Sequence, residues 1–183
     1  MKHAYEIVYS DQEGLTSVSQ YSMGHYDLTT LWQGKPLARK PTRSVKLIVE
    51  NPQSQSDYVS NAASWPIFSK RFLDIVLPLA HRDIEVLPAP LFISDGSPWP
   101  GYFLVNCIRR VRCLHKTKSV LIRQGKHIRG VIKYVLKAKE LPEQVHIFRI
   151  DEFPFGLFLS QKLRARLKGS GLTGLCLFRW PAI

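Results

Sequence analysis

The sequence predicts a single α+β domain in which a few helices pack on a mixed or mainly antiparallel sheet. Three observations lead to this prediction. The 183 residues are 45% hydrophobic and 11% aromatic, which is typical of a globular chain with one substantial core. Two segments carry apolar residues at helical spacing. The remaining apolar runs are short and separated by turn-forming residues, as strands are.

The order of patterns along the chain divides it into two regions. Residues 1–60 predict a variable, β-containing N-terminal region, and residues 61–183 predict an α+β region, the two forming one compact domain. The polar stretch 51–57 contains no apolar residue before Tyr58 and is the best candidate for a break.

The N-terminal region begins with an expected strand. Tyr5, Ile7 and Tyr9 lie on one side of an extended segment because they alternate with other residues. A basic, proline-containing loop over 35–46 is expected to lead into a second strand over 45–49.

A first helix is expected from about Pro66. Ser64 supplies a side-chain oxygen for a free backbone N–H, and proline is tolerated in a first helical turn. The apolar residues of this segment share one helical face: Phe68, Phe72, Ile75 and Val76.

A β-rich region follows, because prolines from Pro88 to Pro100 exclude a long helix. Strands are expected over 84–87, 91–94, 102–113, 120–123, 131–136 and 145–150. In the strand over 102–113, Cys107 and Cys113 are expected to share a buried face, with Asn106, Arg110 and Arg112 towards solvent.

The last elements are a helix and a closing strand. Ser160 is placed to cap a helix from about Gln161, in which Leu163 and Leu167 recur four residues apart. Gly169 and Gly171 are suited to end it in a left-handed turn, before a strand over 175–180.

Charge is the clearest departure from an average composition. The net charge is +12, and the segment between Asp95 and Glu140 holds eleven basic residues without one acid. Such a field favours an anionic partner. The residues expected to contact this partner are Arg109, Arg110, Arg112, Lys116, Lys118, Arg123, Lys126 and Arg129. The three arginines come first, because a guanidinium binds a carboxylate in a planar, bidentate way.

A basic nucleic-acid-binding module is the alternative reading of this charge. Such modules interleave basic residues with exposed aromatic rings that stack on bases. Between Phe103 and Phe148 the only aromatic ring other than histidine is Tyr134. The sequence therefore makes nucleic acid the less favoured partner, although a solvated basic surface with no partner also fits the composition.

Catalytic and metal-binding patterns are not evident in the sequence. It contains no GxSxG, P-loop, HExxH or GxGxxG motif, and the histidines lack metal-ligand spacing. Cys107 with His115 would be a thiol–imidazole pair without an orienting third group. The adjacent Asp151 and Glu152 are better explained as solvated loop residues. The prediction is a protein that is not an enzyme, with no cofactor and no metal.

Three cysteines, Cys107, Cys113 and Cys176, with no close pair fit reduced thiols. The N-terminus has no apolar stretch of signal-peptide length, and no later run is long enough to span a membrane. A cytoplasmic location with no membrane partner is therefore expected.

Several stretches from Trp65 onward carry a family resemblance. They are Trp65-Pro66-Ile67-Phe68-Ser69, Asp83-Ile84-Glu85-Val86-Leu87-Pro88, Tyr102-Phe103-Leu104-Val105-Asn106, Ile147-Phe148-Arg149-Ile150, Leu159-Ser160 and Gly171-Leu172-Thr173-Gly174-Leu175, with Trp180-Pro181 at the end. In this order they resemble a family of bacterial immunity proteins, named for a myxobacterial representative, that accompanies polymorphic toxins and type VI secretion effectors.

The resemblance implies a function. It implies that the chain neutralises a cognate toxin effector by tight binding, either covering the toxin's active site or blocking the toxin's own contacts. The basic charge of this chain adds the expectation that the toxin has an acidic contact surface. The C-terminal motif residues are then expected to determine the fold, while the basic segment guides the encounter.

Overall fold

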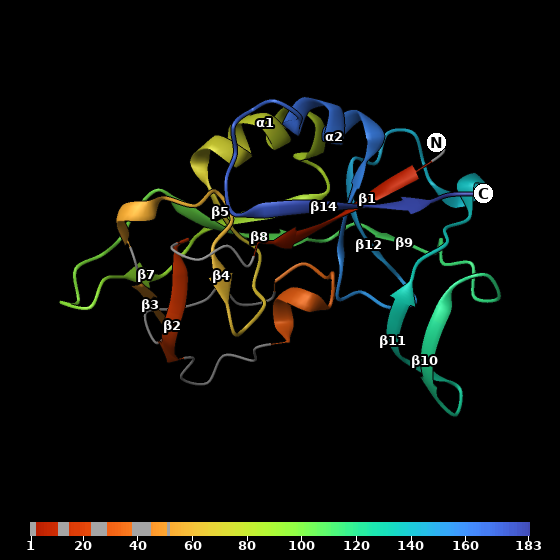
Figure 1. The fold of residues 1–183 in the computed structure, drawn as a ribbon, viewed down its shortest axis with the longest axis horizontal. Coiled ribbons are helices and arrows are strands. Elements are labelled where there is room, and N and C mark those ends of the chain that lie inside the picture. Colours follow the sequence, from red (N-terminus) through yellow and green to blue (C-terminus); the bar gives the residue numbers. More distant parts are fainter. Residues whose placement is uncertain (1–2, 11–14, 23–28, 38–44, 51) are drawn as a thin grey trace.

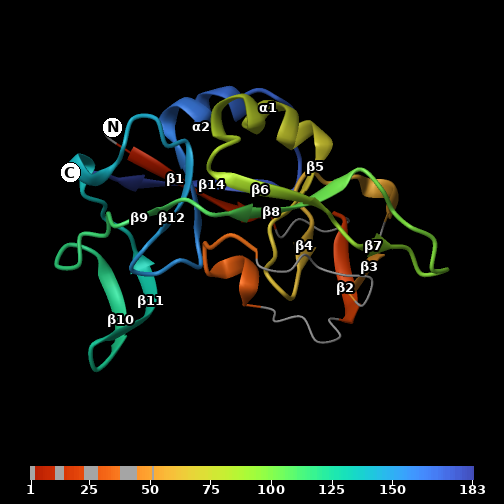
Figure 2. The ribbon, with the colours of Figure 1, turned by 180° about the vertical axis from the view of Figure 1, so that it is seen from behind.

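A computed structural model describes residues 3–10, 15–22, 29–37, 45–50 and 52–183. Two α-helices are present in this part of the chain, α1 (Lys70–Ala80) and α2 (Gln161–Leu167). They lie side by side over the strands (Figures 1 and 2). Three short 3-10 turns complete the helical elements: Thr30–Trp32, Pro52–Ser54 and Ala138–Glu140.

The strands form four sheets among the described residues. The five-stranded sheet has the order β14 (Leu175–Pro181), β1 (His3–Tyr9), β13 (Leu157–Ser160), β12 (Ile147–Ile150) and β9 (Arg110–Val111). The four-stranded sheet has the order β4 (Ser60–Asn61), β2 (Ser17–Ser22), β3 (Lys46–Glu50) and β7 (Leu91–Phe92). The three-stranded sheet has the order β5 (Ile67–Ser69), β8 (Tyr102–Cys107) and β6 (Ile84–Pro88). The fourth sheet is a hairpin of β10 (Val120–Gln124) and β11 (His127–Lys133). Two helices with several mixed or antiparallel sheets are compatible with the predicted α+β class, although the strands form four sheets where one was expected.

Strand β1 occupies an interior position in the five-stranded sheet. It pairs antiparallel with β13, Ala4 opposite Ser160, and with β14, Ile7 opposite Leu177. Its two faces enter different apolar clusters, since Ile7 packs with the helices and Ala4 packs on the other side of the sheet. The sheet therefore joins residues of the N-terminal region to the two C-terminal strands. The proposed division at residue 60 stays a prediction.

The first helix begins later than expected. Residues Ile67–Ser69 form β5 and pair with β8, so they are not available to a helix. Ser64 has a positive φ of 50°, and Ser69 is the cap, whose side chain accepts a hydrogen bond from Phe72 N at 3.2 Å. Tertiary pairing thus moves the helix start from the expected Pro66 to Lys70.

The second helix agrees with its prediction. The Ser160 side chain accepts from Leu163 N at 3.1 Å, and Leu163 and Leu167 are buried. Gly169 and Gly171 have φ values of +78° and +67°, which is the left-handed turn expected after a helix.

The expected single strand over 102–113 is wrong. The chain turns after Cys107, where the Ile108 and Arg109 N–H groups both donate to the Asp83 carbonyl. Cys107 and Cys113 are both buried but belong to different apolar clusters, so they do not share a face. Asn106 does not face solvent either, because it is fully buried and its Nδ2 donates to Lys35 O and Glu85 Oε2.

The polar stretch after residue 51 has a buried end. Ser56 exchanges hydrogen bonds with Thr16, its Oγ accepting from Thr16 N at 2.9 Å. Asp57 is 1% exposed and accepts from Ser69 Oγ, from Thr173 N at 2.8 Å and from Arg71 at 3.3 Å. This polar cluster links the start of α1 to the loop before β14. The expected basic loop falls largely on residues 38–44, which lie outside the described residues.

Candidate partner-binding surface

The eight residues predicted to contact a partner fall into two groups in the structure. Arg109, Arg110 and Arg112 lie in and around β9, the edge strand of the five-stranded sheet. The others lie in the turn before β10 and in the hairpin itself: Lys116, Lys118, Arg123, Lys126 and Arg129.

The arginines of the first group have carboxylate partners from distant parts of the sequence. Arg109 Nε lies 2.9 Å from Asp83 Oδ1, and the Asp83 side chain is 5% exposed. Arg110 Nη2 lies 2.6 Å from Asp151 Oδ1, and Arg112 Nε lies 3.4 Å from Asp151 Oδ2. The positive field of this group is therefore partly offset within the molecule.

Arg110 also makes structural contacts with the segments around Gly34 and Asp151. Its guanidinium donates to the carbonyls of Gln33 and Asp151, at 3.2 and 3.1 Å. Its stem packs so closely on Gly34 that a Cβ there would lie 3.0 Å from Arg110 Cγ. Gly34 has a φ of +63°, so both its backbone and its surroundings favour glycine. Arg112, whose side chain is 80% exposed, is the most accessible of the three.

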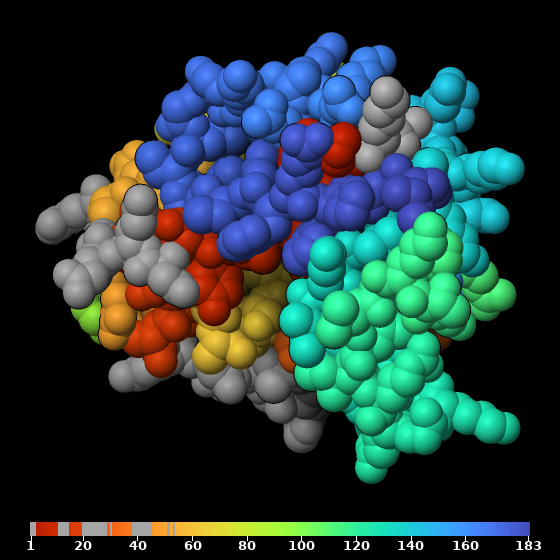
Figure 3. All heavy atoms as spheres, turned by 45° about the vertical axis from the view of Figure 1, so that its right-hand side comes forward, coloured from red at the N-terminus to blue at the C-terminus, as the bar shows by residue number. Residues whose placement is uncertain are grey.

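The cations of the second group are differently placed. All five side chains are exposed, and none forms an ion pair with any carboxylate of the described residues. Arg129 Nε donates to Gln124 Oε1 at 2.8 Å, a neutral partner within the hairpin. Figure 3 shows this hairpin, in green to cyan, as a projection from the body of the protein. The uncompensated charge of the segment is thus concentrated on the projection.

The hairpin also exposes aliphatic side chains, which the sequence reasoning did not single out. Val120, Ile122 and Ile132 are 47%, 52% and 64% exposed, and they are three of the seven large hydrophobic residues that are exposed in the described part of the chain. The opposite side of the hairpin packs on the core through Leu121, Ile128 and Val131. The sequence did carry a signal for these exposed side chains, the apolar run Val120-Leu121-Ile122. A strand with one buried face exposes alternate residues, so an unbroken apolar run must leave some apolar side chains exposed.

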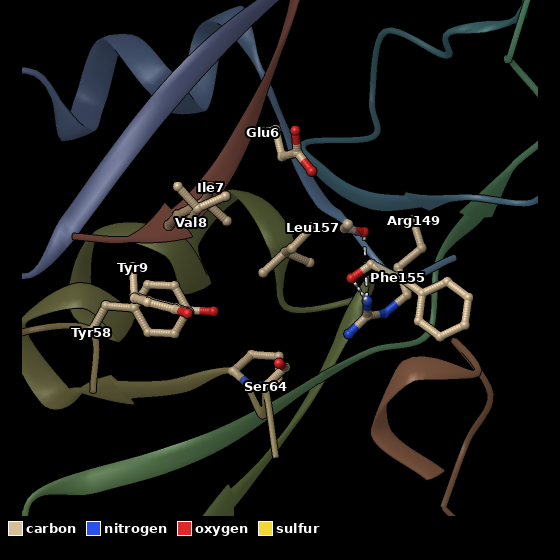
Figure 4. Close-up of a pocket in the computed structure, with 11 residues that line it drawn as sticks. Glu6, Ile7, Val8, Tyr9, Tyr58, Ser64, Arg149, Phe155 and Leu157 are labelled. Atoms are coloured by element: carbon tan, nitrogen blue, oxygen red, sulfur yellow. Dashed lines mark hydrogen bonds between the residues drawn. The ribbon is translucent and has the colours of Figure 1, made fainter. Parts of the chain in front are cut away.

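A small cavity of about 140 Å³ lies beside β1 and is lined by Glu6, Tyr58 and Arg149 among others (Figure 4). Arg149 is 1% exposed, and its guanidinium donates to Pro154 O at 2.7 Å and to Leu31 O at 2.8 Å. Burial raises the pKa of the Glu6 carboxyl, which accepts from Trp180 Nε1 at 2.9 Å, and raises the pKa of Tyr58 to about 12. Because main-chain carbonyls occupy the terminal nitrogens of Arg149, its hydrogen bonds tie loops together.

The residues considered for chemistry do not converge. Burial raises the pKa of the Cys107 thiol to about 12, and the ring of His115 contacts Thr117 Oγ1. Asp151 binds two arginines, and Glu152 Oε2 accepts from Leu114 N at 3.4 Å. In the described ranges no group of three His, Cys, Asp or Glu is placed to hold a metal ion. Within those same ranges, no helix has both the length and the apolar character needed to cross a membrane.

Comparison with protein families gives a match. A family model described as the Immunity protein family (Imm11) matches residues 16–179, which is most of the chain. A comparison with curated proteins finds no match.

Proposed function

Because the chain belongs to the Imm11 family of immunity proteins, we propose that it neutralises a cognate bacterial toxin effector by binding it through the basic surface described above. The family match is the observation that carries the proposal, since it spans 164 positions, from 16 to 179. The mode of action is inhibition by protein–protein contact, without catalysis and without a cofactor. The toxin would be one of the polymorphic or type VI secretion effectors, met in the cytoplasm of the protected cell.

The charge distribution supports a partner with an acidic contact surface. A net charge of +12 creates a long-range field, and the exposed cations at Lys116, Lys118, Arg123, Lys126 and Arg129 concentrate it on one projection. Complementary charge speeds the encounter of two proteins and disfavours wrong partners. Arg109, Arg110 and Arg112 lie beside this projection in the chain, and Arg112 has the most exposed side chain to offer.

A nucleic-acid partner is the second candidate, supported by the same charge. Stacking on bases would need exposed aromatic rings near the cations. Tyr134, the only ring other than histidine between Phe103 and Phe148, is 4% exposed. The protein partner is therefore favoured over the nucleic acid.

Co-expression tests the proposal. The chain is expressed in a cell that produces the toxin encoded by the adjacent reading frame, and growth and co-purification are measured. The expected result is restored growth and a stable complex, while the same chain leaves an unrelated toxin active. Failure to bind or protect would reject the proposal. In that case, affinity for mixed DNA or RNA that falls steeply with salt would support the nucleic-acid alternative.

A further inference from the structure

We infer that the β10–β11 hairpin is an arm that enters a cleft in the toxin, and that this cleft has apolar walls and an acidic floor. The inference rests on the proposed function and adds to it the contacting element and the chemistry of the partner surface. Three features carry it: the isolation of the hairpin, the rigidity of its stem, and the separation of its aliphatic and cationic side chains.

The hairpin stands apart from the other sheets. Its two strands pair with each other and with no other strand of the described chain. Figures 1 and 2 show it projecting from the end of the five-stranded sheet that carries β9. At about 3.3 Å per residue, the five residues of β10 span roughly 16 Å. One side of the hairpin packs on the core through Leu121, Ile128 and Val131, so the opposite side and the tip are the parts that a cleft could receive.

The stem of the hairpin is held by hydrogen bonds. Ser119 Oγ accepts from Val135 N at 2.9 Å and donates to Val135 O at 3.1 Å. His115 N donates to the same carbonyl at 2.8 Å, and Leu114 bridges Leu136. An arm that is already ordered loses little conformational entropy on binding, so more of its contact energy contributes to affinity.

The exposed aliphatic side chains lie towards the base of the hairpin and three of its cations lie towards the tip, while Lys133 is a further exposed cation at the base. At the base, Val120 pairs with Lys133 and Ile132 is the unpaired residue next to this pair, while Ile122 lies nearer the tip, opposite Gly130. A Cβ on Gly130 would lie 3.1 Å from Ile122 Cδ1, so the glycine leaves room for this side chain. The cations Arg123, Lys126 and Arg129 lie at the tip. A complementary cleft would be apolar at its walls and acidic at its floor, with a further acidic group at its mouth to meet Lys133.

The pairing register argues against a second copy of the chain as the occupant. It shifts twice, so that Arg129 and Ile132 are skipped on β11. Bulges and charged side chains on exposed strands prevent edge-to-edge pairing, and the tip cations of two copies would repel each other. Nucleic acid is disfavoured for a separate reason, because the only ring between residues 120 and 133 is His127.

The test compares paired substitutions that leave the core intact. The tip variant is Arg123→Glu with Lys126→Glu, and its matched control is Lys162→Glu with Arg166→Glu on α2, where the two side chains are also exposed. The aliphatic variant is Ile122→Ser with Ile132→Ser, and its control is Phe178→Ser on β14, where the side chain is 54% exposed. Association and dissociation rates with the toxin, the growth of toxin-producing cells and the urea midpoint are measured for each protein.

The tip variant and the aliphatic variant are expected to change the binding kinetics in different ways. The tip variant should associate at least about 10-fold more slowly, with a defect that shrinks as salt is added. The aliphatic variant should bind about 30-fold more weakly, mainly through faster dissociation. Controls should stay within about 3-fold of the wild type, and all urea midpoints should be close, since exposed substitutions rarely change stability by more than about 0.5 kcal/mol.

Two results would overturn the inference while leaving the proposed function in place. One is a hairpin variant, tip or aliphatic, that binds the toxin and protects cells as well as its control variant does. The other is a wild-type dimer, seen by sedimentation, that the hairpin variants dissociate without losing toxin binding, which would assign the arm to a second copy. A wild-type chain that neither binds nor protects would reject the function and the inference together.

Discussion

Replacing Asp57 by alanine is expected to destabilise the protein far more than removing any exposed carboxylate. Asp57 is 1% exposed and accepts hydrogen bonds from Ser69 Oγ and from Thr173 N, residues 12 and 116 positions away. Each hydrogen bond to a charged acceptor contributes about 1.5–3 kcal/mol. The ion pair with Arg71, whose side chain is 62% exposed, adds at most about 1 kcal/mol because water screens it.

The free energy of unfolding should therefore fall by about 4 kcal/mol, which for a chain of this length lowers the melting temperature by roughly 10 °C. Urea unfolding at neutral pH measures the change. The matched control is Asp74→Ala, which removes an exposed carboxylate paired with Lys70 at i,i+4 and should cost no more than about 0.5 kcal/mol.

A double-mutant cycle tests whether the loss comes from the hydrogen bond to Ser69. The Asp57→Ala and Ser69→Ala changes together should cost at least about 1 kcal/mol less than their sum, because they share one interaction. Equal losses for Asp57→Ala and Asp74→Ala would refute the reasoning, and so would simple additivity in the cycle.

Three further predictions concern buried groups. Cys176 is exposed, whereas burial raises the pKa of both Cys107 and Cys113 to about 12. A thiol reagent should therefore modify one thiol in the native protein and three after denaturation. Rapid reaction of three thiols in the native protein would contradict this prediction. Burial lowers the pKa of His146 from 6.5, so between its folded pKa and 6.5 the unfolded chain binds more protons, and stability should fall as pH falls through this window. His146→Gln should flatten that part of the urea midpoint profile, and an unchanged slope would count against it. Arg149→Lys should lower the free energy of unfolding by about 3 kcal/mol, because one ammonium group cannot replace the two guanidinium nitrogens that donate to Pro154 O and Leu31 O. A urea midpoint equal to that of the wild type would show that these paired hydrogen bonds are not needed.

Local signals in the sequence were sufficient for some elements. The second helix was predicted with its cap, because Ser160 and the spacing of Leu163 and Leu167 act within a few residues. The start of the first helix was not, because Ser64 and Ser69 carry the same cap chemistry. Only the pairing of Ile67–Ser69 with β8 decides between them.

Contacts between distant residues explain the other failures. Alternation predicted that Asn106 faces solvent, but β8 is the middle strand of its sheet and is buried on both sides. The composition located the acid-free basic segment, yet it could not separate Arg109 and Arg110 from the hairpin cations. That distinction depends on Asp83 and Asp151, which lie far away in the sequence.

The interior position of β1 has a consequence for the timing of protection. Residues 3–9 leave the ribosome more than 140 residues before their partners at 157–160 and 175–181. Pairings of such separation are slow to form, and the strand stays unpaired while the intervening chain is translated. Each newly started copy therefore gains its five-stranded sheet only when translation of these strands is finished. Under the proposed function, a cell exposed to the toxin would depend on copies completed beforehand.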